Sequence, residues 1–119
     1  MRKSAKVTIY HNPRCSKSRQ TLQLLEAQGI EPEIIKYLEH PPSKSKLKEI
    51  LKKLDMQPRD LMRTKEQVYK DTQLDDASLT KEQLIEAMIE QPKLIERPIV
   101  LANDKAALGR PPEDVLKII

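Results

Sequence analysis

The sequence predicts an α/β protein in which a four-stranded mixed sheet is flanked by helices. Two short apolar runs near the N-terminus lie on either side of an amphipathic stretch, which is the pattern of a strand, a helix and a parallel strand. Two further apolar runs near the C-terminus are joined by a turn and followed by a helix start. Between these halves the periodicity is helical, so we expect a helical insertion at about 43–92.

The N-terminal half is predicted to contain a strand over 7–10, a helix over 16–28 and a strand over 33–38. Leucines form an apolar stripe along the helical stretch. Gly29 suits the position just after a helix end, because glycine adopts left-handed backbone angles without strain. A crossover of this kind places its two strands parallel to each other.

The insertion is predicted to contain two helices and two shorter helical turns. Ser43 is a suitable N-cap for the first helix, and Thr80 begins a capping box with Gln83 before the last one. One face of the first helix is apolar, because its leucines and isoleucine recur at helical spacing. In chain order, the helical segments are expected over 44–54, 59–63, 66–70 and 81–91.

The C-terminal half is predicted to be a strand over 98–102, a turn over 103–105 and a returning strand over 106–109. The run Pro111-Pro112-Glu113-Asp114 then starts a helix, since proline and acidic residues favour the first helical turn. A βαβ unit followed by a ββα unit around a mixed sheet is the thioredoxin/glutaredoxin-like fold. We expect one such domain over residues 1–119.

Composition bounds the class of protein. The chain has 119 residues, of which 38% are hydrophobic and 34% charged, as in soluble globular proteins. No apolar stretch is long enough for a signal peptide or a membrane span, and the single cysteine cannot form an internal disulfide, so we expect a cytoplasmic protein. The net charge is +4, but the lysines alternate with acids and aromatics are few, so nucleic acid is not an expected partner.

The single cysteine, Cys15, is the strongest candidate for chemistry. It lies between a predicted strand and a predicted helix, where the unpaired N–H groups of the first helical turn favour a thiolate. A lone cysteine is more often a small buried apolar residue, but the polar and cationic flanks here, including Arg14 and Lys17, favour a reactive thiol. Residue 18 is serine, so there is no Cys-x-x-Cys pair, and an oxidised Cys15 needs a thiol from outside the chain.

Two histidines and three arginines are further candidates. His11 could hold the thiolate as a cation, shape the loop through hydrogen bonds, or be purely structural, whereas His40 is expected in a surface loop. Two separated histidines and one cysteine predict no metal site. Each arginine alone could be a surface residue, but at element ends they could together clamp an oxyanion; they are Arg63, Arg97 and Arg110. In a thioredoxin-like fold, Arg97-Pro98 also fits the usual place of a cis proline beside the cysteine.

Several segments together resemble one family. They are His11-Asn12-Pro13-x-Cys15-x-x-Ser18-Arg19, Tyr37-Leu38-Glu39-x-Pro41-Pro42, Leu61-Met62-Arg63, Glu96-Arg97-Pro98-Ile99-Val100 and Arg110-Pro111. In these segments the chain resembles the glutaredoxin-coupled arsenate reductase (ArsC) family, in its short YfgD-like branch. The resemblance extends over essentially the whole chain, from about Val7 to Ile118.

The resemblance implies a function and roles for these residues. Cys15 would be the nucleophile that attacks arsenate or a similar oxyanion, and His11 would support the thiolate. The residues expected to bind the oxyanion are Arg63, Arg97 and Arg110, and those expected to support the loop are Asn12, Ser18 and Pro98. Glutathione would be the co-substrate, glutaredoxin would restore the thiol, and no bound cofactor would be required.

Two alternatives remain at this point. The first is a glutathione-linked thiol oxidoreductase that acts on another substrate through the same reactive cysteine. The second is a partner-binding regulator of the Spx-like branch, which shares this fold. Ser18 argues against the regulator, because that branch commonly has a Cys-x-x-Cys pair near the N-terminus.

Overall fold

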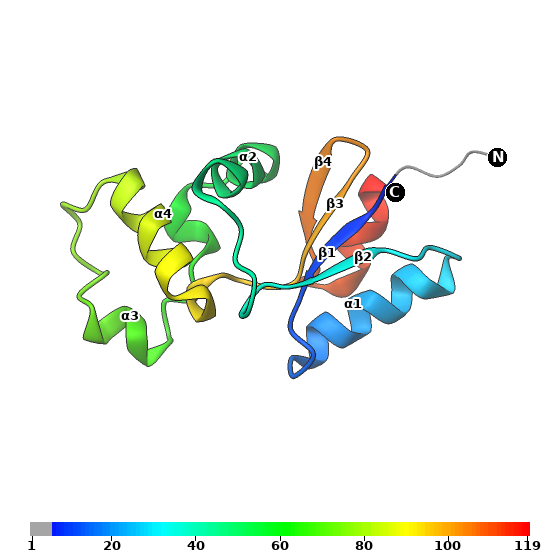
Figure 1. Cartoon of the computed structure of the whole chain (residues 1–119), viewed down its shortest axis with the longest axis horizontal. Helices are drawn as coiled ribbons and strands as arrows, with labels where there is room; N and C mark the ends of the chain where they lie inside the picture. Colours follow the sequence, from blue (N-terminus) through cyan, green and yellow to red (C-terminus); the bar gives the residue numbers. More distant parts are fainter. Residues whose placement is uncertain (1–5) are drawn as a thin grey trace. The chain divides into compact units, whose positions relative to one another are not determined.

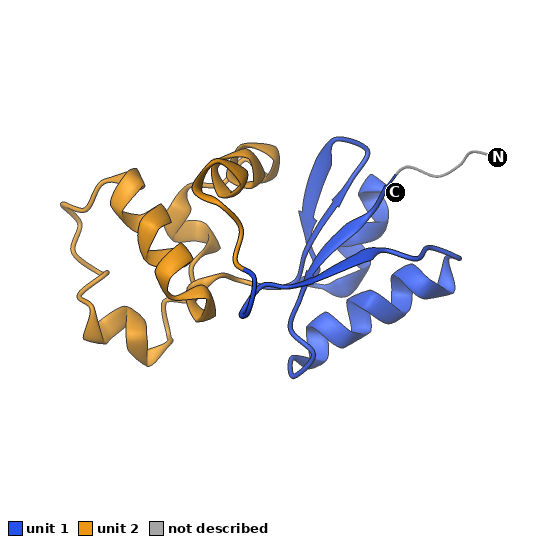
Figure 2. Ribbon diagram, viewed as in Figure 1, with its two compact units in different colours: residues 1–40, 97–119 blue, residues 41–96 orange. Residues whose placement is uncertain are grey.

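The structure is a computed structural model that describes residues 6–119. The chain forms two compact units, one of residues 1–40 with 97–119 and one of residues 41–96 (Figure 2). The second unit corresponds to the predicted helical insertion at about 43–92. The assignment of residues 1–119 to a single domain stays a prediction.

The first unit contains the predicted four-stranded mixed sheet (Figure 1). Its strands are β1 (Thr8–His11), β2 (Glu33–Lys36), β3 (Ile99–Ala102) and β4 (Lys105–Leu108), in the order β2-β1-β3-β4. The pair β1–β2 is parallel, and the other two pairs are antiparallel. The expected parallel crossover and C-terminal hairpin are therefore confirmed.

Two helices pack on this sheet. They are α1 (Ser16–Ala27) and the 3₁₀ helix η3 (Pro112–Ile118). The core of the unit joins both helices to the two central strands, and its buried residues are Val7, Ile9, Leu25, Val100, Ala102 and Val115. Gly29 follows the helix end with a φ of 78°, the left-handed conformation expected there.

The limits of all four strands differ from the predictions by one or two residues. β1 spans 8–11 rather than 7–10, and β3 begins at residue 99 rather than 98. β2 ends at Lys36 rather than at residue 38, because a turn follows in which the N–H groups of Glu39 and His40 donate to the Lys36 carbonyl. The hairpin turn is shorter than expected, since Asn103 and Asp104 alone form it with φ values of 52° and 64°. Asparagine and aspartate tolerate such angles, so β4 begins at residue 105.

The second unit is helical. Its elements are α2 (Lys44–Leu54), η1 (Pro58–Leu61), α3 (Gln67–Asp71), α4 (Lys81–Glu90) and η2 (Pro92–Leu94). Ser43 Oγ accepts the N–H of Lys46 at 3.1 Å, and Thr80 and Gln83 form the predicted capping box. The short helix η2 was not predicted, because three residues give too little periodicity for recognition.

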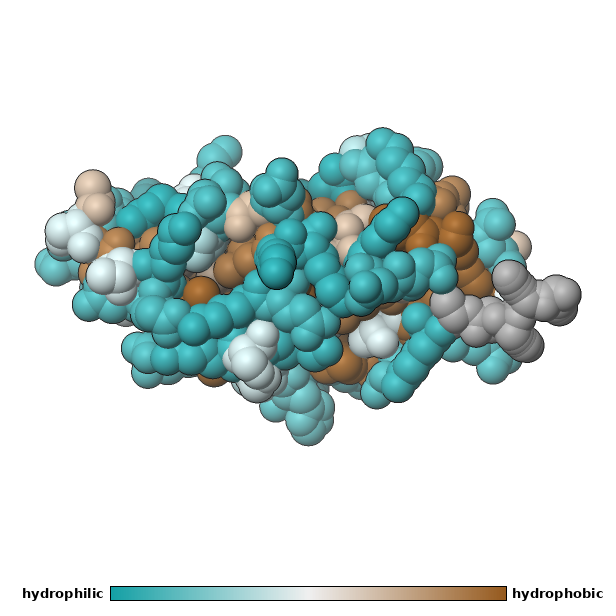
Figure 3. All heavy atoms as spheres, turned by 90° about the horizontal axis from the view of Figure 1, so that it is seen from above, coloured by the Kyte–Doolittle hydropathy of each residue, from teal (hydrophilic) through white to brown (hydrophobic). Residues whose placement is uncertain are grey.

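The interior and the surface of the second unit follow ordinary burial rules. Its fully buried side chains include Leu47, Ile50, Leu61, Met88 and Leu94. Lysines of α2 pair with glutamates of α4, with Lys44 contacting Glu86 at 2.9 Å and Lys48 contacting Glu82 at 2.6 Å. Hydrophilic side chains also cover most of the face of the molecule that Figure 3 shows. No helix within residues 6–119 is both long and apolar enough to cross a membrane.

Candidate active site

Cys15 lies where β1 leads into α1. It is the N-cap residue of α1, with extended backbone angles and no side-chain cap of its own. The loop before it is held by its own polar groups, because the Cys15 N–H donates to the Asn12 carbonyl and the Arg14 N–H donates to Asn12 Oδ1, both at 3.0 Å. The sequence therefore folds locally so that the thiol faces the start of a helix.

The surroundings of Cys15 favour its thiolate. The residue is a free cysteine and only 9% exposed. Burial raises the pKa of the Cys15 thiol, but the backbone N–H of Ser18, the charge of Arg97, the N–H of Lys17 and a hydrogen bond from Arg97 together bring that pKa below its ordinary value. A thiolate held by helix N–H groups and an arginine is a nucleophile.

Arg97 and Arg110 lie next to each other in the first unit. Arg97 precedes β3 and Arg110 follows β4, and Arg110 Nη1 donates to the Arg97 carbonyl at 3.2 Å. Arg97 also acts on Cys15 through its charge and a hydrogen bond. The Arg97–Pro98 peptide bond is cis, as predicted, and so is Arg110–Pro111, which was not predicted.

His11 is held inside the loop by a hydrogen bond. Its side chain is only 6% exposed, and Nδ1 lies 2.6 Å from the hydroxyl oxygen of the fully buried Ser18. Burial, and then the charges of Lys36 and Arg19, lower the pKa of His11. A neutral imidazole that bonds Ser18 matches the loop-shaping alternative, and the lowered pKa disfavours the cationic one.

Arg63 belongs to the second unit. It follows η1, its N–H donates to the Leu94 carbonyl at 2.7 Å, and its guanidinium pairs with Glu66 at 2.9 Å. The structure thus brings Cys15, His11 and Arg97 together with Arg110 in the first unit, whereas the contacts described for Arg63 lie within its own unit. His40 is exposed, as expected of a surface loop.

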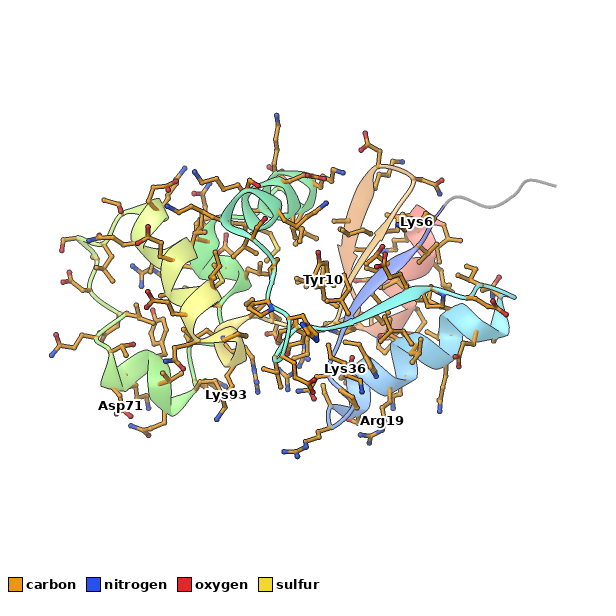
Figure 4. The ribbon with its side chains drawn as sticks, viewed as in Figure 1. Lys6, Tyr10, Arg19, Lys36, Asp71 and Lys93 are labelled. Carbon is orange, nitrogen blue, oxygen red and sulfur yellow. The ribbon has the colours of Figure 1, made fainter. Side chains whose placement is uncertain are left out.

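Two cations near the loop had no role assigned from the sequence. Arg19 Nη1 donates to the Pro13 carbonyl at 2.9 Å and so closes the loop from α1. Lys36 is the register partner of His11 across β1 and β2. Figure 4 shows Arg19 on α1 and Lys36 at the end of β2. Lys36 lies beside His11 through the register of the parallel pair, which the sequence alone does not specify.

No group of three or more His, Cys, Asp or Glu side chains that could hold a metal ion occurs in the part of the chain that the structure describes. Exposed cations surround the loop instead, since Arg14, Lys17, Arg19 and Lys36 all face solvent. The site can therefore do thiolate chemistry on an anionic substrate.

Comparison with known proteins decides the family. The model of the ArsC family matches residues 10–118. The chain belongs to the ArsC family. Among relatives, it is 58% identical to the uncharacterized protein YfgD of Escherichia coli, over 95% of this chain and 96% of that protein. It is 52% identical to an arsenate reductase of Haemophilus influenzae, over 95% and 98% of the two chains.

A solved structure supports the same assignment. An arsenate reductase from Vibrio cholerae superposes with a TM-score of 0.95 at 53% identity, over 98% of this chain and 100% of that one. The chain therefore has the thioredoxin-like fold of ArsC family proteins, as predicted. The YfgD-like resemblance is likewise confirmed by the Escherichia coli relative.

Proposed function

We propose that this ArsC family protein reduces arsenate to arsenite, with Cys15 as the nucleophile. The observation that carries the proposal is a buried thiol at the N-terminus of α1, next to Arg97 and stabilised as a thiolate. Relatives that cover nearly the whole chain at about half identity are named arsenate reductases, which supports the choice of substrate.

In the first step, the Cys15 thiolate attacks the arsenic(V) atom of arsenate. A sulfur–arsenic bond forms, and one arsenate oxygen leaves as water after taking up protons. Arg97 and Arg110 would offset the charge of the oxyanion, because guanidinium groups hydrogen-bond oxyanions through two donors. Arg63, the third arginine predicted to bind the oxyanion, stays a prediction; its guanidinium pairs with Glu66 within the second unit.

In the second step, glutathione supplies the thiol that the chain lacks. Its thiolate forms a disulfide with the Cys15 sulfur as the sulfur–arsenic bond breaks, and arsenic retains the bonding electron pair. Arsenic(V) is thereby reduced to arsenic(III), which leaves as arsenite, while two thiols are oxidised. Glutaredoxin then takes the glutathione moiety in a thiol–disulfide exchange and restores Cys15.

The loop residues would keep the thiolate in place for both steps. Ser18 supplies a backbone N–H to the Cys15 sulfur and holds Asn12 and His11 with its hydroxyl. Pro98 follows Arg97 and accepts the N–H of Gly109 at 2.9 Å, so it fixes the segment that carries one arginine. We assign His11 a supporting role through Ser18 rather than a direct role as a charged group.

A second function is favoured by the exposed cations of the loop. Arg14 and Lys17 flank Cys15 with positive charge, which suits an anionic disulfide as well as arsenate. The protein would then be a glutathione-linked thiol oxidoreductase that acts on another substrate. The same thiolate and the same external glutathione serve both functions, so only the substrate separates them.

The test is NADPH oxidation in the presence of arsenate, glutathione, glutathione reductase and glutaredoxin. We expect arsenate-dependent turnover that disappears in Cys15→Ser. If there is no turnover but Cys15 is still alkylated rapidly at neutral pH, arsenate reduction is rejected and the second function is favoured. An unreactive Cys15 would reject both enzymes and favour the partner-binding regulator.

A further inference from the structure

Gly109 lies where two segments of the site meet. It is buried, it follows β4, and its N–H donates to the Pro98 carbonyl at 2.9 Å. Arg97 directly precedes Pro98, and Arg110 directly follows Gly109. One backbone hydrogen bond therefore joins the two arginine-bearing segments at positions next to their arginines.

A side chain at position 109 has no room. A Cβ built on Gly109 would overlap Thr21 Oγ1 and lie 2.8 Å from Pro98 Cγ and 3.2 Å from Pro98 Cδ. Interiors are packed too densely to absorb such contacts without movement. The backbone angle φ at Gly109 lies outside the left-handed region, so the requirement for glycine is steric.

Thr21 cannot move aside freely. Its side chain is fully buried, and its hydroxyl donates to the Lys17 carbonyl at 2.8 Å. It lies one turn after Ser18 on the buried face of α1, and Ser18 holds the Cys15 loop through Asn12. Displacing Thr21 would therefore displace the first turns of α1, whose N–H groups face the thiolate.

We propose that Gly109 is a positioning residue that sets the separation between the thiolate end of α1 and the segments that carry Arg97 and Arg110. Without a Cβ at this position, α1 packs through Thr21 directly against Gly109 and keeps Cys15 within reach of Arg97. An added methyl group would separate the helix from these segments. The proposal uses the site of the proposed function, but it concerns the charge state of the thiol and so is testable without arsenate.

The experiment compares the rate of alkylation of Cys15 by iodoacetamide against pH in the intact protein and in Gly109→Ala. We expect the apparent pKa of Cys15 to rise by about one unit in the variant, which lowers the alkylation rate about tenfold at pH values below both pKa values. The plateau rate at high pH should stay the same, because the atoms nearest the new methyl group belong to Thr21 and Pro98 and not to Cys15.

Gly29 provides the matched control, since the chain has only two glycines. A Cβ at Gly29 would meet no atom within 4 Å, but its φ of 78° disfavours alanine. Gly29→Ala should therefore lower stability and leave the alkylation profile of Cys15 unchanged. An equal shift in both alanine variants would overturn the proposal, because general loosening would then explain it.

The double variant Thr21→Ala/Gly109→Ala removes the atom that the new methyl group would overlap. Relative to Thr21→Ala alone, we expect less than half the pKa shift seen in the wild-type background. If Gly109→Ala alone does not fold, the double variant should still fold, with an alkylation profile close to that of Thr21→Ala, and its failure to fold would contradict the overlap with Thr21 as the cause. A folded Gly109→Ala with a wild-type profile would contradict the proposal, whereas a shifted profile without arsenate turnover would contradict only the proposed function.

Discussion

His11 Nδ1 lies 2.6 Å from Ser18 Oγ, and this contact joins the end of β1 to the first turn of α1. The same serine oxygen accepts the N–H of Asn12 at 3.0 Å. Through these two contacts the hydroxyl of the fully buried Ser18 links both sides of the loop that presents Cys15. The loop is thus held by a polar contact inside the fold, and the first two predictions concern this contact.

Replacing Ser18 by alanine should destabilise the protein and slow the chemistry of Cys15. The buried His11 ring and the Asn12 N–H would both lose their partner, which costs about 1–3 kcal/mol in the free energy of unfolding. Urea unfolding measures this loss, with Ser16→Ala as the control because Ser16 is an exposed serine on the same helical turn. Equal stability of the two variants would contradict the role of the hydroxyl.

His11 should make stability depend on pH. Burial and nearby cations lower its pKa in the folded state below the ordinary 6.5, so the unfolded chain binds more protons between the two pKa values. The contribution of the neutral His11 ring to the free energy of unfolding is complete above pH 6.5 and is lost as pH falls through the folded pKa. It amounts to about 1.4 kcal/mol for each unit by which the folded and unfolded pKa values differ. Unfolding free energies measured from pH 7 downward should show this slope, and His11→Gln should remove it.

Arg97 and Arg110 should have separable effects. Arg97→Gln removes a charge and a hydrogen bond that lower the Cys15 pKa, so alkylation of Cys15 near neutral pH should slow several-fold. Arg110 is assigned to the oxyanion in the proposed function, so Arg110→Gln should raise the KM for arsenate and slow alkylation less than Arg97→Gln does. Alkylation profiles and arsenate kinetics of both variants test this, and identical alkylation by the two would count against it.

Arg59 should be important for the stability of the second unit. Its guanidinium donates to the Tyr69 hydroxyl at 2.7 Å, to the Leu74 carbonyl and to the Asp76 carbonyl at 3.0 Å, and so joins η1 to α3 and the segment that follows. Arg59→Ala should lower the free energy of unfolding by about 2–3 kcal/mol in urea titrations. Tyr69→Phe removes one of these bonds and should cost less; a larger loss for Tyr69→Phe would contradict this role.

Local signals predicted the elements well. The capping residues Ser43 and Thr80 placed the starts of α2 and α4 correctly, because an N-cap acts within three residues of itself. The strand–loop–helix pattern around Cys15 was likewise local. The start of β4 was misplaced by one residue, since the turn residues Asn103 and Asp104 adopt angles that composition favours but does not require.

Contacts between distant segments could not be predicted in this way. The sequence gives no sign that Gly109 packs against Thr21, because 88 positions in the chain separate the two and neither belongs to a motif. The neutral state favoured for His11 also depends on burial and on Lys36 across the sheet. Candidate residues could therefore be named from the sequence, whereas the contacts among them required the folded structure.

The most direct test of arsenate reduction by Cys15 is a single turnover followed by intact-protein mass spectrometry. The protein is incubated with glutathione, with and without arsenate, in the absence of glutaredoxin. We expect Cys15 to gain one glutathione only when arsenate is present, with one equivalent of arsenite released, and Cys15→Ser to gain none. A protein that acquires glutathione equally without arsenate, or that releases no arsenite, would contradict arsenate reduction by Cys15.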